Sequence, residues 1–168
     1  MAFHKSSALP VTIEISNRQS QVPIDPEVVR NFAARVLQGE GVENASISIA
    51  FVDDAAIHTI NRRHLQHDWP TDVITFRLSD SDEEILEAEL VVSGEMAATT
   101  AHGSGANARD ELMLYIVHGL LHLCGYNDVS ENDALQMRQR EGEVLSREGW
   151  ANTFARIGPD AETPLWTV

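Results

Sequence analysis

Two segments in the first third of the chain alternate apolar and polar residues, which is the pattern of strands with one buried face. They are residues 11–17 and 45–52, and both place β-branched side chains at the inward positions. Between them, apolar residues recur at helical spacing as far as Val36, and glycines follow. Asp25 or Pro26 begins this helix, because proline fits the first helical turn. The pattern predicts a strand, a helix and a second strand in that order.

The middle of the chain continues this alternation. A second helix, capped by Asp53 or Asp54, is expected to run to Leu65. Two further strands are expected at residues 71–76 and 89–93, where β-branched and apolar residues gather. Helices that alternate with strands in this way indicate a sheet that is covered by helices.

Polar or small residues separate the remaining elements. Residues 79–89 hold six acidic side chains, a composition more typical of a solvated loop than of a cation site. Residues 99–108 are rich in glycine and alanine, and we expect a flexible stretch there. Ser130 is predicted to cap the last helix, with Asp133 three residues later as an acidic variant of the capping box. Residues 150–168 show no periodicity, which predicts an irregular C-terminal tail.

An apolar segment at residues 112–117 follows an acid-rich helix start and leads directly into two histidines. A helix as apolar as this one is expected to lie inside the fold. We therefore predict an α+β fold, with a single mixed β-sheet packed by helices around this central, metal-binding helix. The 168 residues show no internal repeat, and we expect one domain that comprises residues 1–168.

The amino-acid composition limits the partners and the cellular compartment that can be expected for the protein. The net charge is −14, and only one of the twelve basic residues is lysine, so the chain has no broad basic face for nucleic acid. A bound metal ion, or eleven arginines gathered along one cleft, would offset that charge. The single cysteine, Cys124, excludes an intramolecular disulfide and suits a reducing cytoplasm. No apolar run is long enough for a membrane span or a signal peptide.

The candidate chemistry lies at the end of the central helix, in the pattern H-x-x-x-H-x-x-G-x-x-D. His118 and His122 are four residues apart, so their imidazoles share one face of the helix. Gly125 can end the helix in a left-handed conformation, which lets the chain bring Asp128 back toward the same point. Two imidazoles and one carboxylate make a three-ligand site for a divalent metal, with a position left for water.

The two histidines have two other possible interpretations. A zinc protease carries glutamate immediately after its first histidine as the general base, and this chain has Gly119 there. Histidines that are simply buried and hydrogen-bonded to the backbone are the second possibility. A pair at this spacing, with a helix-ending glycine and a following acid, favours the metal site.

The stretch from His118 to Tyr126 resembles the signature of the YbeY-type endoribonucleases, H-G-x-L-H-L-x-G-Y-D-H. This sequence has Asn127-Asp128 where that signature ends in Asp-His, so the resemblance makes Asp128 the third ligand in place of histidine. The residues from Pro70 to Phe76 are similar to a strand of the same family. The family's proposed catalytic arginine corresponds to Leu65 here, and no other arginine is assigned to replace it.

The resemblance implies a zinc-dependent endoribonuclease that is specific for single strands and acts in ribosomal RNA maturation and ribosome quality control. It implies one Zn²⁺ per chain, bound by His118, His122 and Asp128, and leaves the catalytic residues unassigned. The expected partners are single-stranded RNA, ribosomal RNA and the small ribosomal subunit. Neither a membrane nor DNA is expected as a partner, and the expected location is the cytoplasm.

Two alternatives use the same metal site. The first is a hydrolase of another class, a protease or amidase, whose general base comes from elsewhere, for example Glu95. The second is a ribosome-assembly factor that is not an enzyme, in which the metal only holds the last helix in place. The leucine at position 65 keeps this second alternative open.

Overall fold

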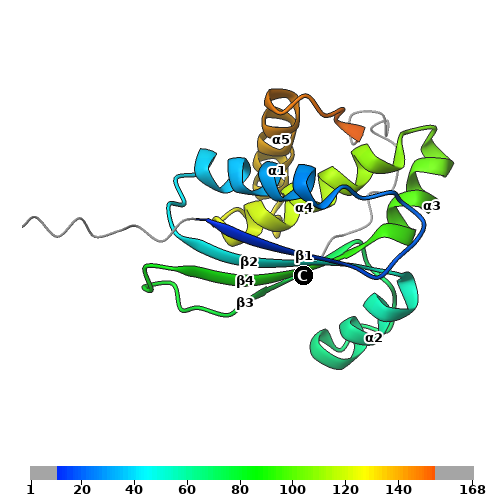
Figure 1. Cartoon of the computed structure of the whole chain (residues 1–168), viewed down its shortest axis with the longest axis horizontal. Helices are drawn as coiled ribbons and strands as arrows, with labels where there is room; N and C mark the ends of the chain where they lie inside the picture. The colour runs from blue at the N-terminus through cyan, green and yellow to red at the C-terminus, as the bar shows by residue number, and fades with distance from the viewer. Residues whose placement is uncertain (1–10, 154–168) are drawn as a thin grey trace, which may run out of the picture.

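A single mixed sheet forms the centre of the protein in the computed structural model, which describes residues 11–153 (Figure 1). The sheet order is β1-β2-β4-β3, where β1, β2 and β4 run parallel and β3 is an antiparallel edge strand. The strands are β1 (Thr12–Asn17), β2 (Ala45–Val52), β3 (Val73–Arg77) and β4 (Leu86–Ser93). Residues 1–10 and most of the predicted tail, residues 154–168, lie outside the described part of the chain.

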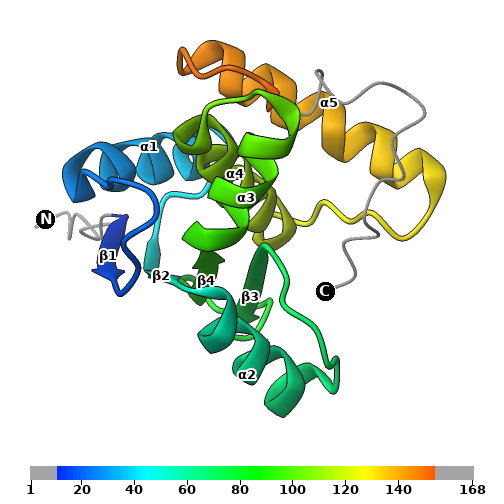
Figure 2. The ribbon, with the colours of Figure 1, turned by 90° about the vertical axis from the view of Figure 1, so that its right-hand side faces the viewer.

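Five helices are described, and they divide unequally between the two faces of the sheet. One face is covered by α1 and α4, with α5 packed on the outer side of α4, whereas α2 lies alone on the opposite face (Figures 1 and 2). The helices are α1 (Pro26–Gly39), α2 (Asp54–Leu65), α3 (Gly94–Ser104), α4 (Ala108–Leu123) and α5 (Glu131–Arg147). Helix α4 is therefore enclosed by the sheet on one side and by other helices on the other.

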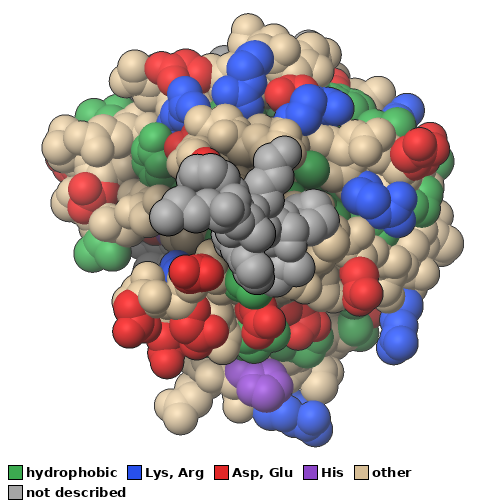
Figure 3. Space-filling view, turned by 60° about the vertical axis from the view of Figure 1, so that its left-hand side comes forward, with side chains coloured by type: hydrophobic (Ala, Val, Ile, Leu, Met, Phe, Trp, Pro, Cys, Tyr) green, Lys and Arg blue, Asp and Glu red, His purple; other side chains and the backbone are tan. Residues whose placement is uncertain are grey.

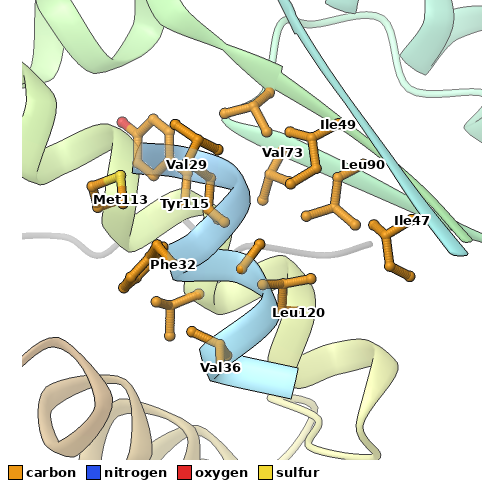
Figure 4. Close-up of a cluster of buried hydrophobic side chains, with 14 of the residues drawn as sticks. Val29, Phe32, Val36, Ile47, Ile49, Val73, Leu90, Met113, Tyr115 and Leu120 are labelled. Atoms are coloured by element: carbon orange, nitrogen blue, oxygen red, sulfur yellow. The ribbon is translucent and has the colours of Figure 1, made fainter. Parts of the chain in front are cut away.

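Helix α4 is buried because its residues from Leu112 to Leu123 are apolar apart from the two histidines. Twelve of its residues are buried, from Glu111 through Leu123. Its apolar side chains meet those of α1, β2 and β4 in one continuous core (Figure 4). The labelled members of this core are Val29, Phe32, Val36, Ile47, Ile49, Val73, Leu90, Met113, Tyr115 and Leu120. At about 25 cal/mol per Å² of apolar surface, burial on this scale holds α4 firmly against the sheet.

The predicted α+β fold is confirmed, and so are several predicted helix ends. Asp25 and Asp53 accept hydrogen bonds from backbone amides at the starts of α1 and α2, and Ser130 accepts one from the amide of Asp133. Among residues 11–153, no helix combines the length and the apolar character that a membrane crossing requires.

Two predictions about the middle of the chain were wrong. Strand β4 begins at Leu86, within the predicted acidic loop, because alternate residues there are buried against neighbouring strands. Residues 94–104 form helix α3, although part of this segment was predicted to be flexible. Ser93 caps α3, and the small side chains of Ala97 and Ala101 allow it to pack closely against α4. Because such small residues are only weakly hydrophobic, the buried face of this helix is hard to recognise from the sequence.

Candidate metal centre

The last two turns of α4 bring His118 and His122 together on one face. Their ring centres are 4.6 Å apart and the rings are nearly perpendicular. The two Nε2 atoms lie 3.0 Å from each other. His118 is buried and His122 is partly buried, so both rings sit at the edge of the core rather than in bulk solvent.

The chain after α4 folds back and adds Asp128 to this pair. Gly125 has a φ of +101°, the left-handed conformation that glycine adopts without strain, and the amide of Tyr126 donates to the carbonyl of Leu121. Oδ2 of Asp128 lies 3.6 Å from Nε2 of His118 and 3.8 Å from Nε2 of His122. Within the described part of the chain, these three residues form the one cluster whose donor atoms, all within 4.8 Å of one another, could hold a metal ion.

Both imidazoles have a hydrogen-bond acceptor at Nδ1. Nδ1 of His118 lies 2.6 Å from Oε1 of the buried Glu141 on α5, and Nδ1 of His122 lies 3.1 Å from the carbonyl oxygen of Tyr126. An acceptor at Nδ1 assigns the proton of a neutral ring to that nitrogen, so each Nε2 presents a lone pair. Two lone pairs and a carboxylate then converge on one point. The donor set therefore fits a divalent cation such as zinc.

The surrounding charges affect the two histidines in opposite directions. Burial disfavours the charged form of His118, but the hydrogen bond and charge of Glu141, together with the charges of Asp72 and Asp128, outweigh burial and raise its pKa. Burial and the nearby His118 lower the pKa of His122, and Asp128 only partly opposes them. The carboxylates thus favour a positive charge at this centre, whereas the two rings resist carrying one each.

Asp72 is a second acid that faces this centre, and no role was predicted for it. It precedes β3 and is buried, and its Oδ1 accepts hydrogen bonds from the amide of Val73 and the hydroxyl of Thr71. Burial raises its pKa to about 6. The sequence signal for this residue was an acidic side chain immediately before a largely apolar strand.

Glu141 also had no predicted role. It is buried on α5 in company with Met137, Val144 and Leu145. A lone acid at a buried helical position usually has a partner. That partner is His118, which is 23 residues earlier in the chain.

Leu65, at the position of the family's arginine, lies in an apolar environment. Leu65 packs against the smaller cluster between α2 and the sheet, which contains Ile57 and Ile74. Arg77 contacts the end of α4, where its Nη1 donates to the carbonyl oxygen of Leu123. Arg77 comes from β3, so it approaches the centre from a different element than Leu65 does.

Three other histidines, His64, His67 and His102, do not belong to the three-residue cluster. His64 packs the edge of its ring against Phe76, and His67 stacks on Trp69. His102 is exposed in the last turn of α3.

Gly119 occupies the position at which a zinc protease carries its general base, and the sheet leaves no space for a larger side chain there. A Cβ at Gly119 would lie 3.0 Å from Leu90, 3.1 Å from Thr75 and 3.2 Å from Val73, in each case against a methyl group of the sheet. A glutamate in this position would point into the apolar core. Glu95, the other suggested base, accepts a hydrogen bond from the amide of Asp54 at the start of α2.

A polar pocket adjoins the turn that carries Asp128. Its volume is about 240 Å³, and its lining residues come from the turn and from the first part of α5. They are Cys124, Gly125, Tyr126, Asn127, Asp133 and Gln136.

The sequence is similar to known proteins over most of its length. A family model described as Endoribonuclease YbeY matches residues 14–149. Two proteins described as Endoribonuclease YbeY are similar over most of their length. The one from Pelotomaculum thermopropionicum is 36% identical over 143 residues, which cover 79% of this chain and 94% of that protein. The one from Syntrophotalea carbinolica is 35% identical over 141 residues, with 80% and 94% covered.

The fold also resembles a protein of Thermotoga maritima whose structure was solved in solution. The TM-score is 0.57 at 20% sequence identity, and the match covers 90% of this chain and 99% of the other. At this identity the likeness concerns the fold alone.

Proposed function

The chain belongs to the YbeY endoribonuclease family, and from that premise we propose that it is a zinc-dependent enzyme that cleaves single-stranded RNA during ribosomal RNA maturation. We propose His118, His122 and Asp128 as the ligands of one Zn²⁺ ion. The observation that carries the proposal is the convergence of two Nε2 atoms, 3.0 Å apart, with the carboxylate of Asp128.

Each proposed ligand is held by a neighbouring group. Glu141 accepts the Nδ1 proton of His118, and the carbonyl of Tyr126 accepts that of His122, so both rings keep Nε2 directed at the same point. Asp128 is set by the turn at Gly125. A divalent cation bound there would polarise a phosphoryl oxygen and activate water, which lowers the barrier to phosphodiester cleavage.

A protease or amidase on the same centre is less well supported. Residue 119 faces the sheet, so the usual position of the general base is closed by packing. Glu95 is occupied in capping α2. The position of the family arginine is filled by Leu65, which makes apolar contacts. A ribosome-assembly factor without enzymatic activity is therefore a second alternative, and a cleavage assay distinguishes it from an enzyme.

The deciding experiment combines metal analysis with cleavage assays on untagged protein purified without added metal. We expect about one zinc per chain, cleavage of a labelled single-stranded RNA, and much slower cleavage of the same sequence as a duplex. A chelator should abolish cleavage, and added zinc should restore it. Casein should stay intact.

Each other outcome selects an alternative. Zinc without cleavage of any substrate would favour the assembly factor. Chelator-sensitive cleavage of casein with RNA left intact would favour the protease. Protein that neither contains nor binds a divalent metal would overturn the proposed centre itself.

The cellular setting follows from the same proposal. We expect the protein in the cytoplasm, in contact with ribosomal RNA of the small subunit, and with a part in ribosome quality control. Cells that lack it should accumulate small-subunit RNA with unprocessed ends. Co-sedimentation of the protein with small ribosomal subunits at low salt would test the partner directly.

A further inference from the structure

The loop between α2 and β3, residues 66–72, displays a tryptophan to solvent. The side chain of Trp69 is 54% exposed, and its ring stacks on that of His67 with centres 4.7 Å apart and planes 12° apart. Among the large apolar side chains that are exposed in residues 11–153, Trp69 is the only aromatic one. One face of the indole is thus supported by a second flat ring, and the residue remains widely accessible.

The loop that carries Trp69 is fixed to α2 by hydrogen bonds. Nδ2 of the buried Asn61 donates to the carbonyl oxygen of Trp69 across 2.8 Å. Nε2 of His58 lies 2.8 Å from Oδ1 of Asp68, and Gln66 ends α2 in the left-handed conformation. The indole is therefore presented by an ordered backbone, so little conformational entropy is lost when a flat ligand binds to it.

Trp69 also stands close to the metal centre along the chain. Asp72, three residues later, is near enough for its charge to act on His118. Val73 packs against α4 at Gly119, next to His118. Three residues of extended chain span at most about 10 Å, so Trp69 lies within about that distance of Asp72.

The same region carries free positive charge in an acidic protein. Arg62, Arg63 and His64 are exposed in the last turn of α2, and neither arginine has an ion-pair partner in the described part of the chain. By contrast, Arg35 and Arg140 are bound to glutamates on the far side of α4. On the face in Figure 3, acidic side chains gather mainly at the lower left, and basic side chains lie along the top, at the right and at the bottom.

We propose that Trp69, supported by His67, is a stacking platform for one unpaired base of the RNA substrate, and that Arg62 and Arg63 contact its phosphates. This inference rests on the proposed function and extends it. An indole face accepts any base, but only a base that is free of a duplex can lie on it. The platform would therefore contribute to the preference for single strands.

The test compares Trp69→Ala and Trp69→Phe with Leu78→Ala in the full chain. Leu78 is a matched control, because it is exposed and apolar and lies at the opposite end of β3. Binding of a short fluorescein-labelled single-stranded RNA is measured by anisotropy with a chelator present. We expect Trp69→Ala to weaken binding by about 5- to 150-fold, and Trp69→Phe to keep most of the affinity. Leu78→Ala should bind like the parent chain.

Two further measurements separate stacking from a general change in the loop. Inorganic polyphosphate carries the charge of RNA without bases, so its affinity should be the same for Trp69→Ala and the parent chain. Binding of RNA should quench tryptophan fluorescence in the parent chain, and Trp69→Phe should bind RNA with much less quenching. Thermal unfolding of each variant checks that the fold is retained.

The outcomes distinguish this inference from the proposed function. If the parent chain cuts and binds RNA while Trp69→Ala does both equally well, the platform is wrong and the endoribonuclease stands. Equal losses for RNA and polyphosphate would also overturn it, because they indicate an electrostatic or structural effect. If the parent chain neither binds nor cuts single-stranded RNA, the proposed function fails and the platform fails with it.

Discussion

The carboxylate of Glu141 lies 2.6 Å from Nδ1 of His118, and both side chains are buried. This contact links α5 to the end of α4 and fixes the orientation of the ring. A carboxylate in such a position keeps the proton on Nδ1 and makes Nε2 a better metal ligand.

The first prediction concerns this contact. Glu141→Gln preserves the shape of the side chain but removes its charge, so zinc affinity should fall by about 10- to 100-fold. Affinity is measured by competition with a chromophoric chelator. Glu143→Gln is the control, because Glu143 is exposed two residues later on α5 and its bridge to Arg140 contributes little. Affinities within a factor of about two for both variants would show that Glu141 does not support the ligand.

The second prediction concerns the third ligand. Asp128→Ala leaves only the two imidazoles, so zinc affinity should fall by more than about 100-fold, beyond the effect of changes around a ligand. Asp128→Asn should be nearly as damaging, because it removes the anionic oxygen. Asp128→His should still bind zinc, since imidazole nitrogen and carboxylate oxygen bind at similar distances.

Asp133 provides the matched control for Asp128. It is a nearby acid in the first turn of α5, and it lines the neighbouring pocket. Asp133→Ala should therefore bind zinc like the parent chain. If Asp133→Ala loses zinc and Asp128→Ala retains it, the third ligand has been assigned to the wrong acid.

Local signals in the sequence predicted much of this architecture. Caps such as Asp25, Asp53 and Ser130 act on amides only two or three residues away, so their effect can be recognised from spacing alone. The pairing of His118 with His122 is equally local, because both lie on one helix. Chain direction after Gly125 then brought Asp128 near them, as expected.

What could not be predicted depends on packing between distant segments. The bond between Glu141 and His118 exists only because α5 lies across α4. The burial of Asp72 depends on the pairing of β3 with β4 in the sheet. The periodicity of a single strand does not predict the order of the strands. Helix α3 was missed because its buried residues are alanines, which carry weak hydrophobic contrast.

The third prediction concerns Asp72 and pH in the metal-free protein. Burial raises its pKa from an ordinary value of 3.8 to about 6, so the folded state binds a proton more tightly than the unfolded state. Stability is therefore lost as pH rises from below 4 through about 6, and the loss persists above that pH. Asp72→Asn cannot ionise. It should be more stable than the parent by about 3 kcal/mol near pH 7.5 and by roughly half of that near pH 5.

Urea unfolding in the presence of a chelator measures this difference. Asp82→Asn is the control, because Asp82 is an exposed acid in the turn between β3 and β4. It should match the parent chain at both pH values. An Asp72→Asn variant that is less stable than the parent near neutral pH would mean that the carboxylate is stabilised in the fold, contrary to its burial.

The last prediction concerns the dependence of RNA binding on salt. Several arginines are paired with glutamates, among them Arg35 with Glu148 and Arg140 with Glu40, so few remain to contact phosphates. Each contact with single-stranded RNA contributes a slope of about −0.7 in log K against log salt, and about three contacts give a total near −2. Anisotropy titrations over a range of potassium chloride concentrations measure the slope.

Two variants assign that slope to particular residues. Replacing both Arg62 and Arg63 by glutamine should make the slope shallower by about 1.4, because two phosphate contacts are lost. Arg35→Gln should leave the slope unchanged, since that guanidinium is already held by a glutamate 2.6 Å away. A parent slope much steeper than −2 would require additional cationic contacts, and an effect of Arg35→Gln as large as that of the double variant would locate them on the face of α1 and α5. In that second case the RNA would have to cross the side of the molecule that is opposite to α2, and the loop that carries Trp69 would not be its principal contact.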